Sequence, residues 1–485
     1  MQMCGFRSLA AVTVAIFLSV QLLGQGPAQP ISPASPADRA LAIEIFKQLI
    51  EINTTDTPLG NVTAGATAMQ KRFLDAGFSA NDVHLMGPDP RKQNLVVRIA
   101  GSGTGKPVLF LCHMDVVEAL AKDWHTDPFQ FVEKDGYYYG RGTQDMKDSD
   151  AALVATFLRL HREGFRPKRD LILALTADEE GGSFNGADWL LQKHRELVDA
   201  AFVINPDSGG VELENGKTVV ADVEATEKVY ADFQVAAVNP GGHSSRPRPD
   251  NAIYELTTAL NKLAAYNFPF EMNAVTRAYF EALSKQESGQ TASDIRAILA
   301  APPDLAAAAR LSAEPSFNSN FRTTCVATRL AAGHANNALA QTAQANVNCR
   351  IFPGHSPEQI RHQLIDLFGD PKLAVKYVSD SGVVTDTAPD RKAIVPPPPL
   401  KEVFEPLTAL VQAIWPGTPV TAVMENGASD SIYFAQAGIP TYGFSAIALE
   451  RDDDRAHGQD ERLPVDSYVK SLDFFYAFLK TLGDD

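Results

Sequence analysis

The stretch Val108-Leu-Phe-Leu-Cys112-His113-Met-Asp115 decides the fold. Four consecutive apolar residues, from Val108 to Leu111, predict a buried strand of a parallel sheet. The strand runs directly into His113, and Asp115 follows two residues later. Side chains at the carboxyl end of such a strand project into the crevice where open α/β sheets bind ligands. A neutral imidazole there suits a metal ion, and a nearby carboxylate can fix its orientation.

Two further apolar stretches end in the same way. Leu171 to Ala177 leads into Asp178-Glu179-Glu180-Gly-Gly, and Ala200 to Ile204 leads into Asn205-Pro-Asp207. A single His-x-Asp motif is more often a histidine in a turn, but repeated acidic strand ends favour a site. In the segments between these stretches, apolar residues recur at the intervals of a helix. Strands that alternate with helices predict an α/β fold, a mostly parallel twisted sheet flanked by helices.

Length and charge restrict the class of protein. The chain has 485 residues, of which 45% are hydrophobic and 21% charged, so two or three globular domains are expected. The formal net charge of -16 argues against nucleic acid or an anionic membrane as a partner.

The N-terminus resembles a targeting segment. Arg7 is the only charge before a mainly apolar run from Leu9 to Leu23, and small residues follow up to Ala28. This layout predicts a signal peptide over residues 1–28 and an exported, periplasmic or secreted protein. The run is short for a membrane span, so no stable span is expected after signal removal, although an uncleaved anchor is the alternative.

The pattern changes after the third strand. Val219 to Val238 alternates like one half-exposed antiparallel strand, and Phe270 to Pro315 has the spacing of a helical insertion. We therefore expect an α+β sandwich over residues 221–385, inserted between two parts of a catalytic domain at residues 37–220 and 395–485.

Five side chains form a candidate ligand set: His113, Asp145, Glu180, Asp207 and His457. Two imidazoles and three carboxylates suit two divalent ions that share one carboxylate, and zinc accepts this set, with cobalt or manganese open. Two such ions can polarise a carbonyl and generate a bridging hydroxide. Glu179, next to Glu180, is not in the ligand set, and we assign it as the general base that takes a proton from the bridging water. Two of the five ligand candidates have purely structural alternatives: Asp145 could cap a helix, and Asp207 could form a turn.

Six motifs along the chain carry a family resemblance: His113-Met-Asp115, Gly140-Arg-Gly-Thr-Gln-Asp145-Met-Lys147, Asp178-Glu179-Glu180-Gly-Gly, Asn205-Pro-Asp207, Gly241-Gly-His243-Ser-Ser and Ala456-His457-Gly-Gln-Asp-Glu461. Their order resembles the M20 family of co-catalytic zinc metallopeptidases. The resemblance implies one zinc held by His113, Asp145 and Asp207. It implies a second zinc held by Asp145, Glu180 and His457. Asp115 would orient His113, Glu179 would be the general base, and the bond between Asp145 and Met146 would be cis.

The same resemblance implies roles for the inserted domain. It would act as a lid and as the surface of a homodimer, with His243 stabilising the oxyanion in the partner's site. Arg350 and Asn337 match lid positions that bind the substrate carboxylate, and residues 427–431 match a backbone loop near it. The alternative is that Arg350 is an ordinary exposed arginine on a strand, with no role in substrate binding.

Cys325 and Cys349 lie on two lid strands that we expect to pair. Export favours a disulfide between them, whereas directly opposed cysteines often have poor bridging geometry, so both outcomes stay open.

These features predict an exported dinuclear zinc peptidase. Its substrate would be a small peptide, either a dipeptide or a short peptide that loses its C-terminal residue. The alternative is a deacylase of N-acyl amino acids. Within the family, an aspartate at position 207 leans toward dipeptidases. The sequence does not identify which side chains of the substrate the enzyme prefers.

Overall fold

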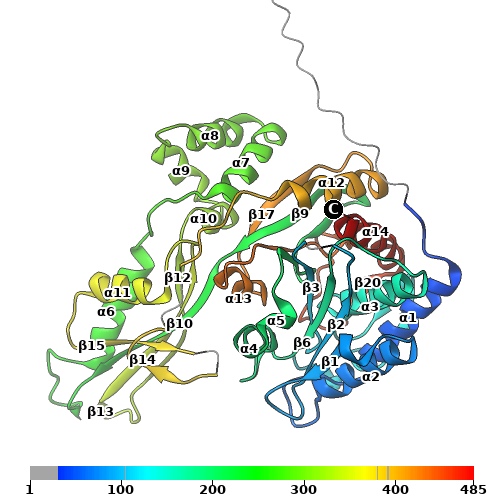
Figure 1. Cartoon of the computed structure of the whole chain (residues 1–485). Helices are drawn as coiled ribbons and strands as arrows, with labels where there is room; N and C mark the ends of the chain where they lie inside the picture. Colours follow the sequence, from blue (N-terminus) through cyan, green and yellow to red (C-terminus); the bar gives the residue numbers. More distant parts are fainter. Residues whose placement is uncertain (1–30, 104, 380, 390–392, 485) are drawn as a thin grey trace, which may run out of the picture.

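The computed structural model describes residues 31–103, 105–379, 381–389 and 393–484 (Figure 1). The predicted signal peptide, residues 1–28, lies outside the described residues. Within them, no helix has both the length and the apolar character needed to cross a membrane.

The main sheet confirms the predicted α/β class. Its order is β1 (Val83–Met86), β2 (Asn94–Ile99), β6 (Leu171–Thr176), β3 (Val108–His113), β7 (Phe202–Ile204) and β18 (Thr441–Tyr442). The pairs β3–β6, β3–β7 and β7–β18 are parallel, and β1 and β2 form an antiparallel edge. Every residue of β3 and β6 is buried, as expected for strands covered on both faces.

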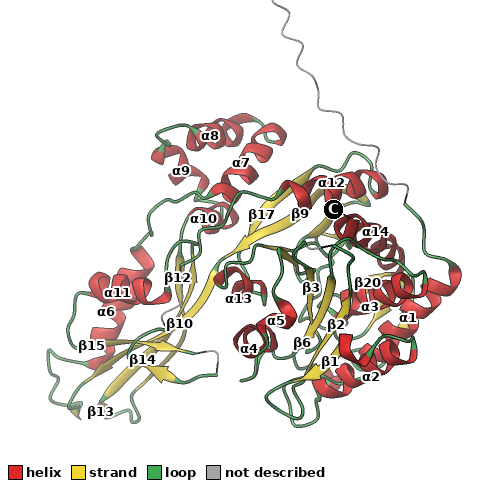
Figure 2. Cartoon of the chain, in the orientation of Figure 1, coloured by secondary structure: helices red, strands yellow, loops and turns green. Residues whose placement is uncertain are grey.

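Helices cover both faces of this sheet (Figure 2). Phe110 and Cys112 of β3 belong to the core with α1 (Pro36–Ile50), α2 (Val62–Asp75), α3 (Lys147–Arg162), α12 (Lys401–Ile414) and α14 (Val465–Asp484). Leu109 and Leu111 point the other way, into a core with α4 (Gly186–Lys193), α5 (Arg195–Val198) and α13 (Ser431–Gln436). The two-residue period of a strand therefore places β3 in two cores at once.

Two smaller sheets complete the catalytic part. One has the order β17 (Val420–Glu425), β9 (Lys217–Glu227), β8 (Gly210–Glu214) and β19 (Ala448–Glu450). The other has the order β20 (Arg462–Pro464), β5 (Tyr137–Tyr139) and β4 (Val132–Lys134).

The prediction of one strand over Val219–Val238 was wrong. This stretch contains most of β9, which pairs in parallel with β17, and β10 (Val229–Val238), which belongs to a different sheet. Lys228 joins them, and its N–H donates to the Glu425 carbonyl at 3.0 Å. Alternation fixes which face a side chain takes but not which strand lies beside it, so the change of sheet leaves no mark in the pattern. The expected boundary at residue 221 falls inside β9.

The lid is a five-stranded antiparallel sheet with two helices. Its order is β12 (Thr324–Ala332), β14 (Thr342–Ile351), β10, β15 (Leu373–Val378) and β16 (Val384–Thr385). The helices α6 (Ala252–Ala265) and α11 (Pro357–Phe368) share one apolar core with the sheet. At the far end, β11 (Gly242–His243) pairs with β13 (Ala338–Leu339). Cys325 and Cys349 face one another across β12 and β14 and form a disulfide.

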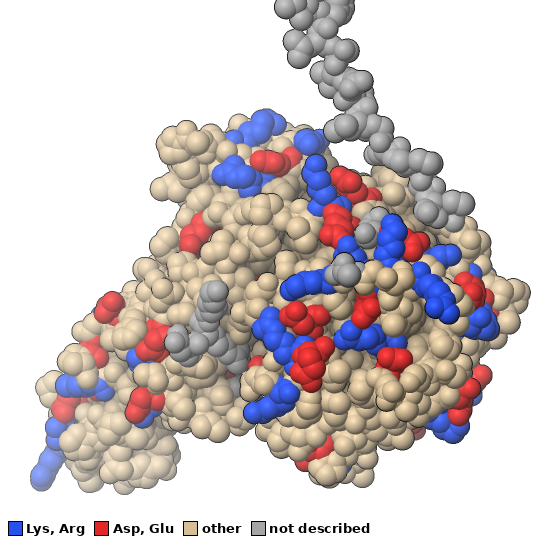
Figure 3. All heavy atoms as spheres, in the orientation of Figure 1, with Lys and Arg blue, Asp and Glu red and all other residues tan. Residues whose placement is uncertain are grey.

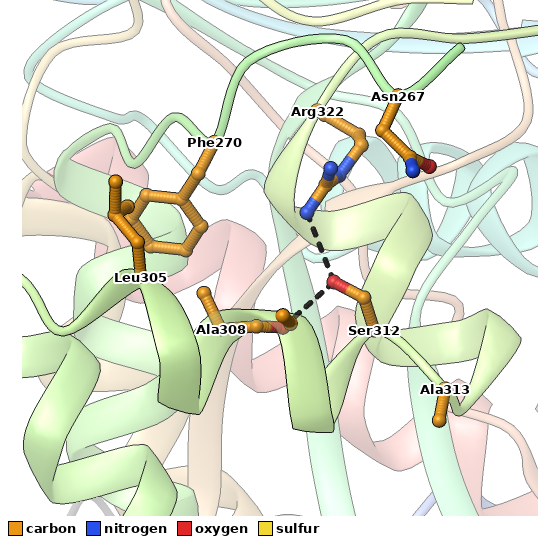
Figure 4. A pocket seen from close by; sticks show the side chains of 8 residues that line it. Asn267, Phe270, Leu305, Ala308, Ser312, Ala313 and Arg322 are labelled. Atoms are coloured by element: carbon orange, nitrogen blue, oxygen red, sulfur yellow. Dashed lines mark hydrogen bonds between the residues drawn. The ribbon is translucent and has the colours of Figure 1, made fainter. Parts of the chain in front are cut away.

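The predicted helical insertion is present beside β17 at the top of Figure 1. It comprises α7 (Ala274–Gln286), α8 (Gly289–Leu299), α9 (Leu305–Leu311) and α10 (Pro315–Phe321), which surround an apolar core of their own. A cavity of about 400 Å³ opens on it, lined by apolar side chains together with Asn267, Ser312 and Arg322 (Figure 4).

Candidate metal centre

The predicted ligands converge at one edge of the main sheet. His113 ends β3, Glu180 lies just beyond β6, and Asp207 lies just beyond β7. Because β6, β3 and β7 are neighbouring parallel strands, their carboxyl ends meet at the same edge. Asp145 is contributed by the turn before α3 and His457 by the loop before β20.

Asp145 lies between the two imidazoles. Its Oδ1 is 3.1 Å from His113 Nε2, and its Oδ2 is 2.8 Å from His457 Nε2. His113 Nε2 is also 3.3 Å from Asp207 Oδ1, and His457 Nε2 is 2.8 Å from Glu180 Oε1. The five ligand candidates thus fall into two groups that share one carboxylate.

These residues fit metal ions. Ligand atoms of His113, Asp145 and Glu180 lie within 4.8 Å of one another, as do those of His113, Glu179 and Asp207. Asp145 Oδ1 is buried, and within the described residues its one close polar neighbour, His113 Nε2 at 3.1 Å, does not meet it with hydrogen-bond geometry, so the oxygen is free to bind a metal ion. Imidazole nitrogen and carboxylate oxygen donors suit zinc and similar divalent ions.

The electrostatics of the cluster also favour cations. Burial raises the pKa of the Glu179 carboxyl well above its usual range, and Asp207 adds to the effect. Burial likewise raises the pKa of Glu180. Hydrogen bonds to Asp145 and Glu180 raise the pKa of His457 to about 10. Buried like charges of this kind are relieved by a positive ion.

Asp115 supports the site through both its side chain and its backbone. Its carboxylate accepts hydrogen bonds from the N–H groups of Glu179, at 3.2 Å, and Glu180, at 3.0 Å. His113 Nδ1 is 3.0 Å from the carbonyl oxygen of Asp115 and 3.9 Å from its carboxylate. The carboxylate therefore fixes the loop after β6, while the ring faces the backbone oxygen. Burial raises the pKa of Asp115 to about 7.

Glu461 is a support that sequence reasoning named only as part of a motif. Its buried carboxylate accepts hydrogen bonds from the N–H groups of Gly142, Gln144 and Asp145 and pairs with Arg141 at 2.5 Å. It thereby holds the turn that carries Asp145. The predicted cis bond between Asp145 and Met146 is present in this turn.

A second missed support is Asp430. Its carboxylate accepts hydrogen bonds from Thr176 Oγ1 at 2.9 Å and Asn185 Nδ2 at 2.7 Å. It ties the residues 427–431 loop to the end of β6 and to the start of α4. No sequence signal points to this contact, because the three residues are far apart in the chain.

A cavity of about 990 Å³ lies between the metal candidates and the lid. Glu179, Glu180 and His457 line the catalytic side. Arg350 lines the lid side, and residues of the loop from Gly427 to Asp430 also line the cavity. Lys228, Tyr230 and three further lid residues line the cavity without having been predicted: Arg329, Asn346 and Asn348.

His243 and Asn337 lie elsewhere. His243 is on β11, opposite Ala338 of β13, and Asn337 directly precedes β13; the Ser244 N–H donates to the Asn337 carbonyl at 3.0 Å. Both are exposed, and neither is among the described residues that line the cavity. In Figure 1, β13 is at the end of the lid farthest from the main sheet. Within one chain, these two residues are therefore separate from the metal candidates.

Surface charge does not mark the site. On the face in Figure 3, acidic and basic side chains are mixed over the catalytic part, and much of the lid surface is neither. The acidic cluster itself is largely buried, which hides it from such a view.

An α/β sheet with a carboxylate and imidazole cluster at its carboxyl edge, covered by an inserted lid, defines a metal-binding hydrolase. The chain matches the model of Peptidase family M20/M25/M40 over residues 109–481 and belongs to that family.

Relatives and solved structures agree with this assignment. N-fatty-acyl-amino acid synthase/hydrolase PM20D1 of Xenopus tropicalis is 27% identical over 384 residues, which cover 78% of this chain and 73% of that protein. The probable carboxypeptidase S-like 2 of Dictyostelium discoideum is 28% identical over 392 residues, covering 77% and 71%. The crystal structure of the M20 family metallo-carboxypeptidase Sso-CP2 from Sulfolobus solfataricus has a TM-score of 0.67 at 15% identity, covering 91% of this chain and 99% of that one.

Proposed function

We propose that the protein is an exported, homodimeric peptidase with two zinc ions. It hydrolyses the amide bond of a dipeptide or releases the C-terminal residue of a short peptide. The observation that carries this proposal is the position of Asp145, whose two oxygens face His113 and His457 at 3.1 and 2.8 Å. Export rests on the predicted signal peptide.

The chemistry divides between the ions and the chain. Two divalent ions bound at this cluster would polarise the amide carbonyl and activate water. Glu179 accepts the proton of the attacking water and delivers it to the leaving nitrogen. Its Oε2 is 4.0 Å from His113 Nε2, and the residue lines the cavity, so it reaches both the metal candidates and the substrate.

Arg350 binds the carboxylate of the amino acid that leaves. Its guanidinium lies over the Tyr230 ring, 4.8 Å from the centroid, and Nη1 donates to the Asn426 carbonyl at 3.4 Å. Among the described residues it has no ion-pair partner, which leaves its charge for a ligand. A planar guanidinium can bind a carboxylate through two parallel hydrogen bonds.

The homodimer forms through the lid. Within the part of the chain that the structure describes, the edge strand β12 pairs only with β14, and Val326 and Leu330 on it are 61% and 60% exposed. A long exposed edge with apolar side chains is a surface that pairs readily with another strand. Association of two lids would deliver His243 and Asn337 of one chain to the cavity of the other.

A second candidate function is hydrolysis of N-acyl amino acids. It is favoured by the relatedness to an N-fatty-acyl-amino acid synthase/hydrolase. Such a substrate has the same amide bond and free carboxylate as a dipeptide, so the roles of Glu179 and Arg350 are unchanged.

The test uses two neighbouring glutamates. Purified zinc-loaded protein is assayed on dipeptides, N-acetyl amino acids and N-fatty-acyl amino acids. Glu179→Gln should lower kcat by at least about 10²-fold while its metal content equals that of the wild type. Glu180→Gln is the matched control and should lose metal. Metal loss from Glu179→Gln would make Glu179 a ligand, and near-normal turnover would remove it from the mechanism.

A further inference from the structure

The cavity of about 400 Å³ on the helical insertion has an apolar end and a polar end (Figure 4). The apolar lining consists of Phe270, Leu305 and three alanines in or just after α9, and the polar lining consists of Asn267, Ser312 and Arg322. Pockets for small ligands have volumes of about 300–1,000 Å³, so this cavity suits a small molecule with a polar head and an apolar tail.

Arg322 brings a positive charge to the polar end. It lines the cavity and is only 9% exposed. Its Nη1 donates to the Phe268 carbonyl at 3.1 Å and its Nη2 to Ser312 Oγ at 2.9 Å, and both acceptors are uncharged. Within the described residues its Nε has no hydrogen-bond partner, and no carboxylate forms an ion pair with it.

This charge cannot be removed by loss of a proton. Burial lowers the pKa of Arg322, but a guanidinium starts so high that it stays protonated at neutral pH. A buried cation without a counter-charge destabilises the fold. The guanidinium also has more N–H groups than its two neutral acceptors use. An anion in the cavity would satisfy both the charge and these donors.

Two exposed side chains complete the two ends of the cavity. Asn267 directly precedes Phe268, and its amide has no hydrogen-bond partner within the part of the chain that the structure describes. The amide is therefore available as a second donor at the polar end. Leu305, at the start of α9, is 63% exposed at the apolar end, where an apolar group of a ligand would cover it.

We propose that this cavity is a second ligand site, which binds a monocarboxylate with a short or medium alkyl chain. The carboxylate is bound by Arg322 and Asn267, and the chain lies along Phe270, Leu305 and α9. A free fatty acid and an N-acyl amino acid both have this chemistry. The cavity shares no lining residue with the cavity at the metal centre, so the site is separate from the one that carries the proposed function.

The competing explanation is that Arg322 only ties the Phe268 segment to α9. The two explanations differ in what happens when the cavity is filled while Arg322 is kept. Ala309 is exposed and lines the cavity, so Ala309→Phe occupies the space of the alkyl chain. Ala306 is exposed on the same helix but is not among the lining residues, so Ala306→Phe is the matched control.

The experiment is calorimetric titration of the full chain with decanoate and with decanamide, which has a neutral head of similar shape. The wild type should bind decanoate at least about tenfold more tightly, as expected for a hydrogen bond to a charged group. Ala309→Phe and Arg322→Gln should each weaken decanoate binding at least about tenfold. Ala306→Phe and Arg350→Gln should leave it unchanged. Because Ala309→Phe and Ala306→Phe share an intact metal centre, carboxylate binding at the metal ions cancels in their comparison.

A comparison of decanoate with N-decanoylglycine identifies the source of the ligand, since the tighter of the two is the form that the site prefers. If Arg322→Gln lowers the melting temperature strongly, Ala309→Phe decides the question alone, because it keeps the arginine. Equal decanoate affinities of Ala309→Phe and Ala306→Phe would overturn the proposal. So would equal wild-type affinities for decanoate and decanamide, or no saturable binding. These are binding measurements, so their outcome is independent of whether the protein hydrolyses any amide.

Discussion

His243 is predicted to work in the site of the neighbouring subunit. It lies on β11 with Asn337 nearby, at the end of the lid farthest from the main sheet, while Glu179 lines the cavity at the metal centre. No described contact joins the two residues within one chain. The perturbation is therefore to disable one residue in each of two chains, with His243→Ala in one and Glu179→Gln in the other.

The expected magnitudes follow from the separate roles. Loss of an oxyanion donor should lower kcat about 10²–10³-fold, and loss of the base about 10²–10⁴-fold, so each homodimer is nearly inactive. With random exchange of subunits in a two-fold dimer, about half of the dimers are mixed. Each mixed dimer has one intact site of two, so about a quarter of the wild-type activity should return.

The assay mixes the two variants under exchange conditions and follows amide hydrolysis, with dimer composition measured by native mass spectrometry. The control replaces the Glu179→Gln partner by a chain that carries both substitutions. This control can form mixed dimers but contains no intact site. Mixed dimers at the expected level without recovered activity would refute the reasoning, and so would recovery with the doubly substituted partner.

Three further predictions concern the metal content, the stability at low pH and the disulfide of the lid. His113→Ala and His457→Ala should each lower metal content measured by plasma mass spectrometry, whereas the surface variant His362→Ala should not. A hydrogen bond to Arg361 lowers the pKa of Glu358 from 4.5 to about 2. Its contribution to stability is therefore complete above about pH 4.5 and is lost as pH falls toward 2. The melting temperature of Glu358→Gln should lie below that of wild type at pH 7 and meet it near pH 2. Cys325→Ser opens a bridge of sequence separation 24. It should lower the free energy of unfolding by about 3 kcal/mol in a urea titration.

The main sheet could be predicted from the sequence because its strands are buried on both faces. Continuous apolar runs at Val108–Leu111 and Leu171–Leu175 favour a strand covered on both faces, and the polar residues that follow them mark where each strand ends. His113, Glu180 and Asp207 could be predicted for the same reason, since neighbouring parallel strands bring their carboxyl ends together. Asp145 and His457 lie in a turn and a loop, and they were identified from the motifs that contain them. The sequence thus determined the α/β class and the chemical types at the site.

Only the tertiary structure decided which distant segments meet. The change of sheet at Lys228, the carboxylate of Glu461 under the Asp145 turn and the link from Asp430 to Thr176 all depend on contacts between residues far apart in the chain. Local periodicity reports the face that a side chain takes, which is set by backbone geometry. It contains no information on the partner, because strand pairing and loop packing are decided by the free energy of the whole core.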